Sequence, residues 1–121
     1  MIFAVNVKAM TDFYQAVAGF SADPRPGDSK KDIRLGKGGK ELLIHSIPPR
    51  IAKTIVIETP PLAREDSAMK PIFDVESLSS ALEQVTQRGG LVTDRTFTLD
   101  GLTLHDIVDP EGNVVQLRAR A

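Results

Sequence analysis

Two parts of the sequence repeat the same order of a short alternating strand followed by an amphipathic helix. The apolar stripe of the first helix consists of Met10, Phe13, Tyr14 and Val17. The stripe of the second helix, at an offset of 68 residues, consists of Leu78, Ala81, Leu82 and Val85. The strands that close the two parts match at an offset of 71 residues. This repeat predicts two βαβββ units that share one sheet.

The clearest turn of the chain, Asp-Pro-Glu-Gly-Asn at 109–113, joins the last two predicted strands. Pro110 presets the backbone for a type I turn, and the side chain of Asp109 can cap that turn. Gly112 supplies the left-handed conformation from which the second strand leaves with the correct twist. The turn therefore predicts a hairpin at the end of the chain.

The repeat divides the single expected domain, residues 1–121, into two modules. Module one covers residues 1–58, a polar linker covers 59–68 and module two covers 69–121. Helices are expected at 9–18 and 77–88, each followed by glycine. A short edge strand is expected within 21–31. Further strands are predicted at 32–35, 41–46, 54–58, 91–98, 102–108 and 114–119.

The composition of the 121 residues excludes several classes of protein. A hydrophobic content of 41% and a net charge of -1 predict a normal core and no general attraction to nucleic acid or to an anionic membrane. Cysteine is absent, which excludes disulfides, thiolate metal sites and a cysteine nucleophile. No apolar run approaches the ~20 residues that span a bilayer, and no basic leader is visible. We therefore expect a cytoplasmic protein.

The order of elements and three short motifs resemble the vicinal oxygen chelate superfamily, which includes glyoxalase I, bleomycin resistance proteins and extradiol dioxygenases. The motifs are the run from Asp109 to Leu117, Phe13-Tyr14 followed by Gly19-Phe20, and Phe73-Asp74-Val75. The resemblance covers nearly the whole chain. It implies an α+β fold in which two βαβββ modules form a curved, cup-like mixed sheet with helices on the outer face. It also implies a homodimer, but no single function, because the superfamily includes lyases, epimerases, dioxygenases and pure binders.

Metal-using members of this superfamily hold their ion at four positions, which by the resemblance fall near Ile2, His45, Lys70 and Gln116. Isoleucine has no lone pair to donate, and a lysine ammonium is only a hydrogen-bond donor at neutral pH. One imidazole and one amide remain, whereas catalytic zinc takes three protein ligands. We therefore expect no metal and no other cofactor.

Five polar residues are predicted to line the cup: Asn6, His45, Lys70, Asp74 and Gln116. His45 is either a cavity-lining imidazole that binds or transfers a proton, or a structural histidine bonded to a neighbour. Gln116 is either a hydrogen-bonding group on the cup floor or a satisfied amide between strands. Lys70 and Asp74 either anchor an anionic ligand or pair with each other, and the pair is favoured. Asn6 occupies the position that matches Asp74.

These observations predict a glyoxalase/bleomycin-resistance-like protein that binds a small organic molecule in the cup without a metal. The alternative is a lyase or isomerase in which His45 is the general base and Lys70 stabilises a developing oxyanion. A metal-dependent enzyme of the glyoxalase or dioxygenase type is a third interpretation. The expected partners are the small molecule and a second copy of the chain, with no nucleic acid and no membrane.

Overall fold

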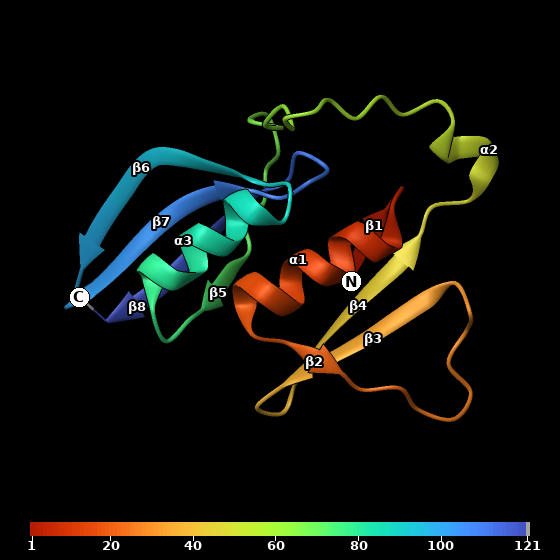
Figure 1. Ribbon diagram of the computed structural model, residues 1–121, viewed down its shortest axis with the longest axis horizontal. Coiled ribbons are helices and arrows are strands. Elements are labelled where there is room, and N and C mark those ends of the chain that lie inside the picture. Colours follow the sequence, from red (N-terminus) through yellow and green to blue (C-terminus); the bar gives the residue numbers. More distant parts are fainter. Residues whose placement is uncertain (121) are drawn as a thin grey trace.

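Each half of the chain folds into a four-stranded mixed sheet with a helix packed against it (Figure 1). This computed structural model describes residues 1–120; Ala121, the end of the predicted second module, lies outside the described residues. The strand order of the first sheet is β1 (Ile2–Ala4), β4 (Lys40–Ser46), β3 (Asp32–Lys37) and β2 (Ser21–Ala22). The strand order of the second sheet is β5 (Ile72–Asp74), β8 (Val114–Arg120), β7 (Leu102–Val108) and β6 (Leu91–Leu99).

The two sheets have the same topology but remain separate. In each, the first strand is parallel to the last strand, and the other neighbours are antiparallel. This arrangement confirms the predicted α+β fold of two βαβββ modules. The prediction that the modules share one sheet is wrong for the single chain. Helices α1 (Val7–Ala18) and α3 (Leu78–Gln87) pack on each other where the modules meet, and β1 and β5 stay edge strands (Figure 1).

The N-cap residues of α1 and α3 show that the two modules align at a different sequence offset from the one predicted by the apolar stripes. Asn6 Oδ1 accepts a hydrogen bond from the backbone N–H of Ala9 at 3.0 Å, and Ser77 Oγ accepts one from Ser80 at 3.3 Å. These two N-cap residues are 71 positions apart, the same offset as the last strands. The offset of 68 predicted for the helices is therefore wrong. A helical stripe nearly superposes on itself after three or four residues, so the stripe alone cannot fix the alignment.

One hydrophobic core runs across both modules. Phe13 and Tyr14 of α1 are buried, with ring centroids 5.1 Å apart and nearly perpendicular planes. Tyr14 also packs against Phe73 of β5, with ring centroids 5.3 Å apart. Gly90, after α3, lies so close to the Phe13 ring that a Cβ atom there would be only 2.6 Å from it. The first helix is thus packed against residues of the second module as well as its own sheet.

The turn at 109–113 forms as the sequence predicts. Asp109 Oδ1 accepts hydrogen bonds from the backbone N–H groups of Glu111 at 2.9 Å and Asn113 at 3.0 Å, which confirms the predicted cap. Gly112 has a φ of 91°, which confirms its left-handed conformation. The buried Asp109 Oδ2 also accepts a hydrogen bond from the Tyr14 hydroxyl at 2.7 Å, so this turn is tied to α1.

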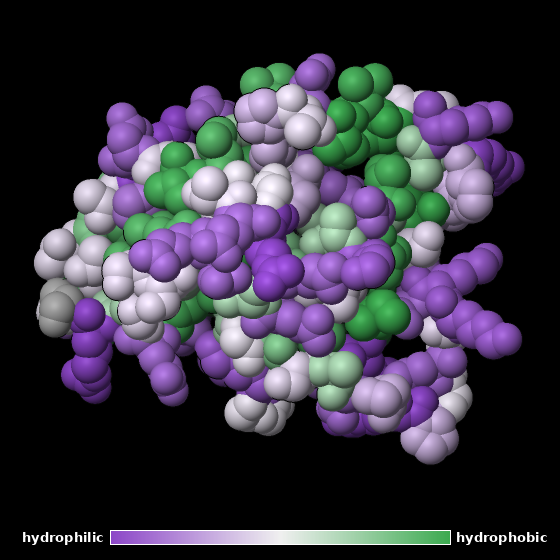
Figure 2. All heavy atoms as spheres, viewed as in Figure 1, coloured by the Kyte–Doolittle hydropathy of each residue, from purple (hydrophilic) through white to green (hydrophobic). Residues whose placement is uncertain are grey.

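The segment between the modules contains a short helix, α2 (Pro49–Ala52), and lacks the strand predicted at 54–58. A proline at the first helical position favours a helix start there. Val56 and Leu62 of this segment are exposed, and Figure 2 shows apolar atoms along the upper edge of the molecule, where the linker runs. None of the helices within residues 1–120 has the length and apolar character of a membrane span.

Candidate functional site

Each sheet has one face against its helix and one face without a helix, which we call the open face. Leu42 and Ile44 are buried under the first helix, so Leu43 and His45 lie on the open face of the first sheet. Residues directly opposite each other on neighbouring strands share a face. The open face of the first sheet therefore carries Phe3, Asp32, Arg34, Glu41, Leu43 and His45.

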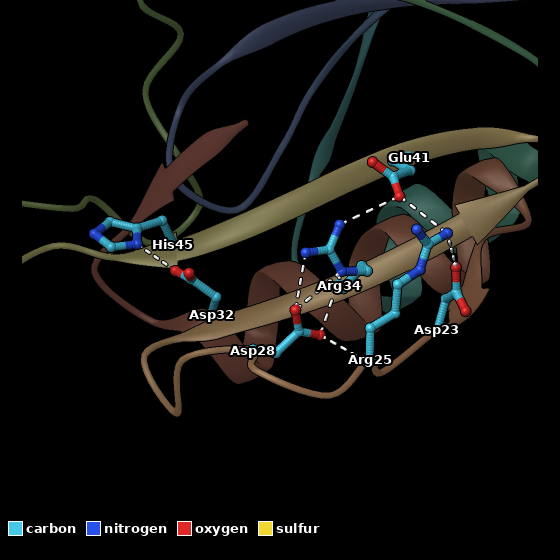
Figure 3. A network of polar contacts seen from close by, with 7 residues as sticks. All are labelled: Asp23, Arg25, Asp28, Asp32, Arg34, Glu41 and His45. Carbon is cyan, nitrogen blue, oxygen red and sulfur yellow. Dashed lines mark hydrogen bonds and ion pairs between the residues drawn. The ribbon is translucent and has the colours of Figure 1, made fainter.

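His45 is held on this face by a carboxylate and an aromatic ring. Its Nδ1 forms a hydrogen bond with Asp32 Oδ1, and its ring meets that of Phe3 edge to face with centroids 5.3 Å apart. Because a carboxylate only accepts hydrogen bonds, Nδ1 carries the hydrogen, and in the neutral form of the ring Nε2 then presents a lone pair. Figure 3 shows Nε2 directed away from Asp32, and the side chain is 30% exposed. His45 is thus bonded to a neighbour and also offers an acceptor; a binding role stays a prediction.

The arginines beside this pair already have acidic partners (Figure 3). Arg34 donates to Asp28 Oδ1 at 2.8 Å and to Glu41 Oε1 at 3.2 Å. Arg25 forms ion pairs with Asp23 at 3.2 Å and with Glu41 at 3.0 Å. The hydrogen bonds from Arg34 lower the pKa of the Asp28 carboxyl below its ordinary value. Since both guanidinium groups are paired with carboxylates, this face does not present them to an anionic ligand.

Gln116 lies on the open face of the second sheet, opposite Ile72 on one side and Asp106 on the other. Lys70 Nζ is 2.7 Å from Asp106 Oδ2, and the Asp106 side chain is only 1% exposed. Asp106 is not among the residues that the sequence predicts to line the cup. Its alternation with the apolar Ile107 places it on the face away from the helix, where a charged residue is ordinary, and nothing in the local pattern indicates that the side chain is buried.

Lys70 and Asp74 do not pair with each other, so the favoured interpretation of these two residues is wrong. Lys70 bonds to Asp106, whereas Asp74 accepts hydrogen bonds from Arg118 Nε at 2.6 Å and Nη2 at 3.0 Å. The hydrogen bond from Arg118 lowers the pKa of Asp74. β5 begins only at Ile72, so Lys70 precedes the strand, but its side chain reaches Asp106 on the open face, the same face that carries Asp74.

Asn6 and Ile2 do not lie on the open faces, where the sequence and the superfamily resemblance predict them. Asn6 caps α1 and lines a separate cavity of about 400 Å³ beside Glu111. Ile2 is opposite the buried Ile44 and packs against the core, so it does not share a face with His45. The single chain therefore brings His45 together with Asp32, and Gln116 together with Asp106 and Lys70, on two different sheets.

A cavity of about 310 Å³ lies between β1 and the second module, and we call it the seam cavity. Its apolar lining includes Phe3, Tyr14, Ile55, Met69, Val114 and Val115. Phe3 lines this cavity and also packs edge to face against the His45 ring, whereas His45 itself is not a lining residue. The volume is at the lower end of the range usual for small-molecule sites, roughly 300–1,000 Å³.

The donors of one chain do not fit the metal centre that the superfamily resemblance implies. Within residues 1–120, no group of three histidine, cysteine, aspartate or glutamate side chains is arranged to hold a metal ion. His45 and Gln116 lie on different sheets, Ile2 faces the core, and the Lys70 ammonium is bound to a carboxylate. Zinc needs three converging protein ligands, and these four positions do not supply them in one chain.

Comparison with solved structures identifies the fold, although no family model and no curated protein matches the sequence. A glyoxalase/bleomycin resistance protein/dioxygenase family enzyme from Burkholderia phytofirmans is 20% identical with a TM-score of 0.68, over 99% of this chain and 94% of that chain. A glyoxalase/bleomycin resistance protein from Albidiferax ferrireducens is 18% identical with a TM-score of 0.68, over 100% and 95% of the two chains. The fosfomycin resistance protein FosX from Mesorhizobium loti is 11% identical with a TM-score of 0.66, over 99% and 87%. The chain therefore has the glyoxalase/bleomycin resistance/dioxygenase fold, and the resemblance to the vicinal oxygen chelate superfamily is confirmed at the level of the fold.

Proposed function

We propose that the protein binds a small organic molecule in the seam cavity, with an apolar body against Phe3 and a hydrogen-bond donor facing His45. The observation that carries this proposal is the position of Phe3, which lines an apolar cavity and touches the imidazole. A mostly apolar cavity with a few placed polar groups is the usual composition of a ligand site. Asp32 orients the acceptor by holding Nδ1–H, and no metal ion is part of this proposal.

The probe for this proposal is 2-naphthol, an apolar ring system with one hydroxyl, titrated by its fluorescence. Phe3→Ala and His45→Gln should each weaken binding about tenfold or more, because each removes a contact of ordinary strength. Ile51→Ala is the matched control, since Ile51 is also an exposed apolar residue but lies on α2. Equal affinity of the wild type and Phe3→Ala would show that the seam cavity is not the binding site.

The expected homodimer also remains a proposal, in which a second copy covers the open faces. Phe3 is 58% exposed on the first sheet and Phe97 is 49% exposed on the second. Phe97 lies opposite Leu104, which in turn lies opposite Arg118, so Phe97 is on the open face. Exposed apolar side chains on an uncovered sheet favour an interface. Sedimentation analysis should show a dimer that Phe97→Asp converts to a monomer, and a monomeric wild type would contradict this.

The Asp32–His45 pair favours a second candidate, the predicted lyase or isomerase with His45 as the general base. An imidazole whose Nδ1–H is held by a carboxylate is suited to abstract a proton through Nε2. Deuterium exchange at the carbon beside the carbonyl of 2-oxobutanoate, followed by proton NMR, tests this activity. The exchange should disappear in His45→Gln, and exchange no faster than that of the buffer would contradict the candidate. Cytoplasmic location remains a prediction.

A further inference from the structure

Two hollows flank the contact between α1 and α3, and the internal repeat relates them to each other. One is the cavity of about 400 Å³ beside Asn6, at the start of α1 and the end of α3. The other, of about 630 Å³, lies between residues 16–19 and residues 75–84, at the end of α1 and the start of α3, and we call it the helix groove. Five lining residues of the cavity have counterparts 71 positions away in the lining of the groove. The pairs are Val5 and Glu76, Asn6 and Ser77, Ala9 and Ser80, Arg88 and Val17, and Gly89 and Ala18.

The cavity beside Asn6 is closed on one side by the chain itself. Residues 57–59 and Pro61, from the segment that runs between the modules, are part of its lining (Figure 1). Pro61 is buried and Ile57 is half-buried, so this segment contributes apolar groups to the cavity. It also contributes an acid, Glu58, to a lining that contains Arg88. Prolines restrict the backbone to extended conformations. The molecule thus shows which kind of chain such a hollow accepts.

The helix groove has the same kinds of helix end but is not closed in this way. Its lining comes from α1 with the following Gly19, from α3 with the three residues before it, and from Lys37 of β3. Among the described residues, none from the segment between the modules lines this groove. The side chains of Ala16, Ser80 and Ala81 are small, which leaves room between the two helices. The groove therefore remains accessible to a segment of another molecule.

The charges of the helix groove favour a basic occupant. Its charged lining residues are Lys37, Glu76 and Glu83. The Lys37 ammonium already donates hydrogen bonds to two backbone carbonyl oxygens, at 2.7 and 2.6 Å. Glu76 and Glu83 are exposed, and the carbonyl groups at the end of α1 also attract cations. The charge is thus opposite to that of the cavity beside Asn6, where the segment between the modules brings an acid to Arg88.

We propose that the helix groove binds an extended, basic peptide segment of another protein. An apolar residue or proline lies between the helix ends, as Pro61 does in the related cavity, and a lysine or arginine meets Glu76 or Glu83. A peptide backbone supplies N–H donors for the free carbonyl groups at the end of α1 and carbonyl acceptors for the free N–H groups at the start of α3. Complementary charge gives such a site its specificity. The groove lies on the helix side of the sheets and does not depend on the seam cavity.

Two peptides with blocked ends separate the contribution of shape from that of charge. The acidic probe has the sequence of residues 55–63, and the basic probe is the same peptide with lysine in place of Glu58. In NMR titration of the wild-type protein, the basic probe should give saturable shifts of the backbone amides at 16–19 and 77–84. The acidic probe should bind about fivefold more weakly or less, because exposed charge pairs each contribute little. Equal affinities, shifts that map elsewhere or no shifts with the basic probe would each overturn the proposal.

Two double substitutions that remove the same charge complete the test. Glu76→Gln with Glu83→Gln should weaken binding of the basic probe about fivefold. Asp94→Asn with Asp100→Asn changes β6 and its hairpin turn, away from the groove, and should leave the affinity unchanged. All four side chains are exposed, so both variants should fold. Equal weakening by both variants would indicate a general attraction to the acidic groups of the protein and overturn the proposal. Failure here leaves 2-naphthol binding at the seam cavity unaffected, so the two proposals fail separately.

Discussion

In each module, the turn that leads into the last strand forms hydrogen bonds with the backbone of the other module. One turn does so through an acidic side chain and the other through a basic side chain. The turn at 109–113 uses Glu111, whose carboxylate accepts hydrogen bonds from the backbone N–H groups of Val5 and Asn6, both at 2.8 Å. These N–H groups precede helix α1, where backbone donors lack partners within the helix. Glu111 is buried at 5% exposure, and Asp109 is buried behind it.

The corresponding turn between β3 and β4 uses a lysine. Lys37 Nζ donates to the carbonyl oxygen of Ala18 at 2.7 Å and to that of Asp74 at 2.6 Å. Ala18 is the last residue of α1, and the carbonyl groups at a helix end lack partners within the helix. Each turn thus carries the charge that suits the helix end it meets. Glu111 and Lys37 therefore meet opposite ends of the same helix, α1, and the backbone groups exposed at each end fit the sign of the charge that meets them.

Asp109, in the turn at 109–113, should contribute most to stability. Asp109→Ala removes the acceptor of four hydrogen bonds, from Tyr14, Glu111 and two nitrogens of Asn113. We expect the free energy of unfolding in urea to fall by about 3 kcal/mol or more, since buried donors lose their partner. A loss below about 1 kcal/mol would show that water replaces these bonds without cost.

Glycines in the two turns should respond differently to alanine. A Cβ atom on Gly112 would lie 2.5 Å from the Leu62 carbonyl oxygen, whereas Gly39 has nothing within 4 Å. Both have positive φ, so both variants carry backbone strain. We expect Gly112→Ala to cost about 2–4 kcal/mol and Gly39→Ala about 1 kcal/mol in urea denaturation. Equal losses would mean that the linker moves aside at Leu62 without penalty.

The lysine contact of the first turn should contribute less than the acids of the second. Lys37→Met keeps most of the apolar stem but removes both hydrogen bonds to backbone carbonyls. Because the contact is partly exposed, we expect a loss of about 1 kcal/mol or less. Lys40→Met is the control, since Lys40 only approaches Asp74 at 3.9 Å. If Lys37→Met lowers the free energy of unfolding as much as Asp109→Ala does, the two turns contribute equally and the expected difference between them is contradicted.

Low pH should destabilise the protein where the turn between β3 and β4 meets Asp74. The carbonyl oxygen of Asp74 accepts a hydrogen bond from Lys37. The hydrogen bond from Arg118 lowers the Asp74 pKa below the ordinary 3.8, so the carboxylate stabilises the folded state above that pH. The stabilisation is lost as the pH falls below 3.8 through the folded pKa. In Asp74→Asn, thermal unfolding between pH 5 and 2 should show a smaller decrease of Tm than in the wild type. The same decrease in both proteins would contradict this assignment.

Local patterns in the sequence determined the elements that carry the fold. The Asp109 cap, the left-handed Gly112 and the alternation around Gln116 depend on neighbouring residues only, and all three are confirmed. The helices follow from their 3.6-residue stripes, which require burial on one side. The alignment of the stripes was wrong by three residues, about one turn, because a stripe cannot distinguish that shift; the caps Asn6 and Ser77 resolve it.

Tertiary structure alone decided which charged groups meet. Lys70 and Asp106 are 36 residues apart, and His45 and Asp32 are 13 apart, so strand register rather than local pattern brings each pair together. The separation of the sheets follows from packing between helices, which the alternation of strands does not encode. Ile2 faces the core because its register places it opposite Ile44. Register and packing depend on the whole chain, and for that reason the sequence identified the elements but misplaced several side chains at the candidate site.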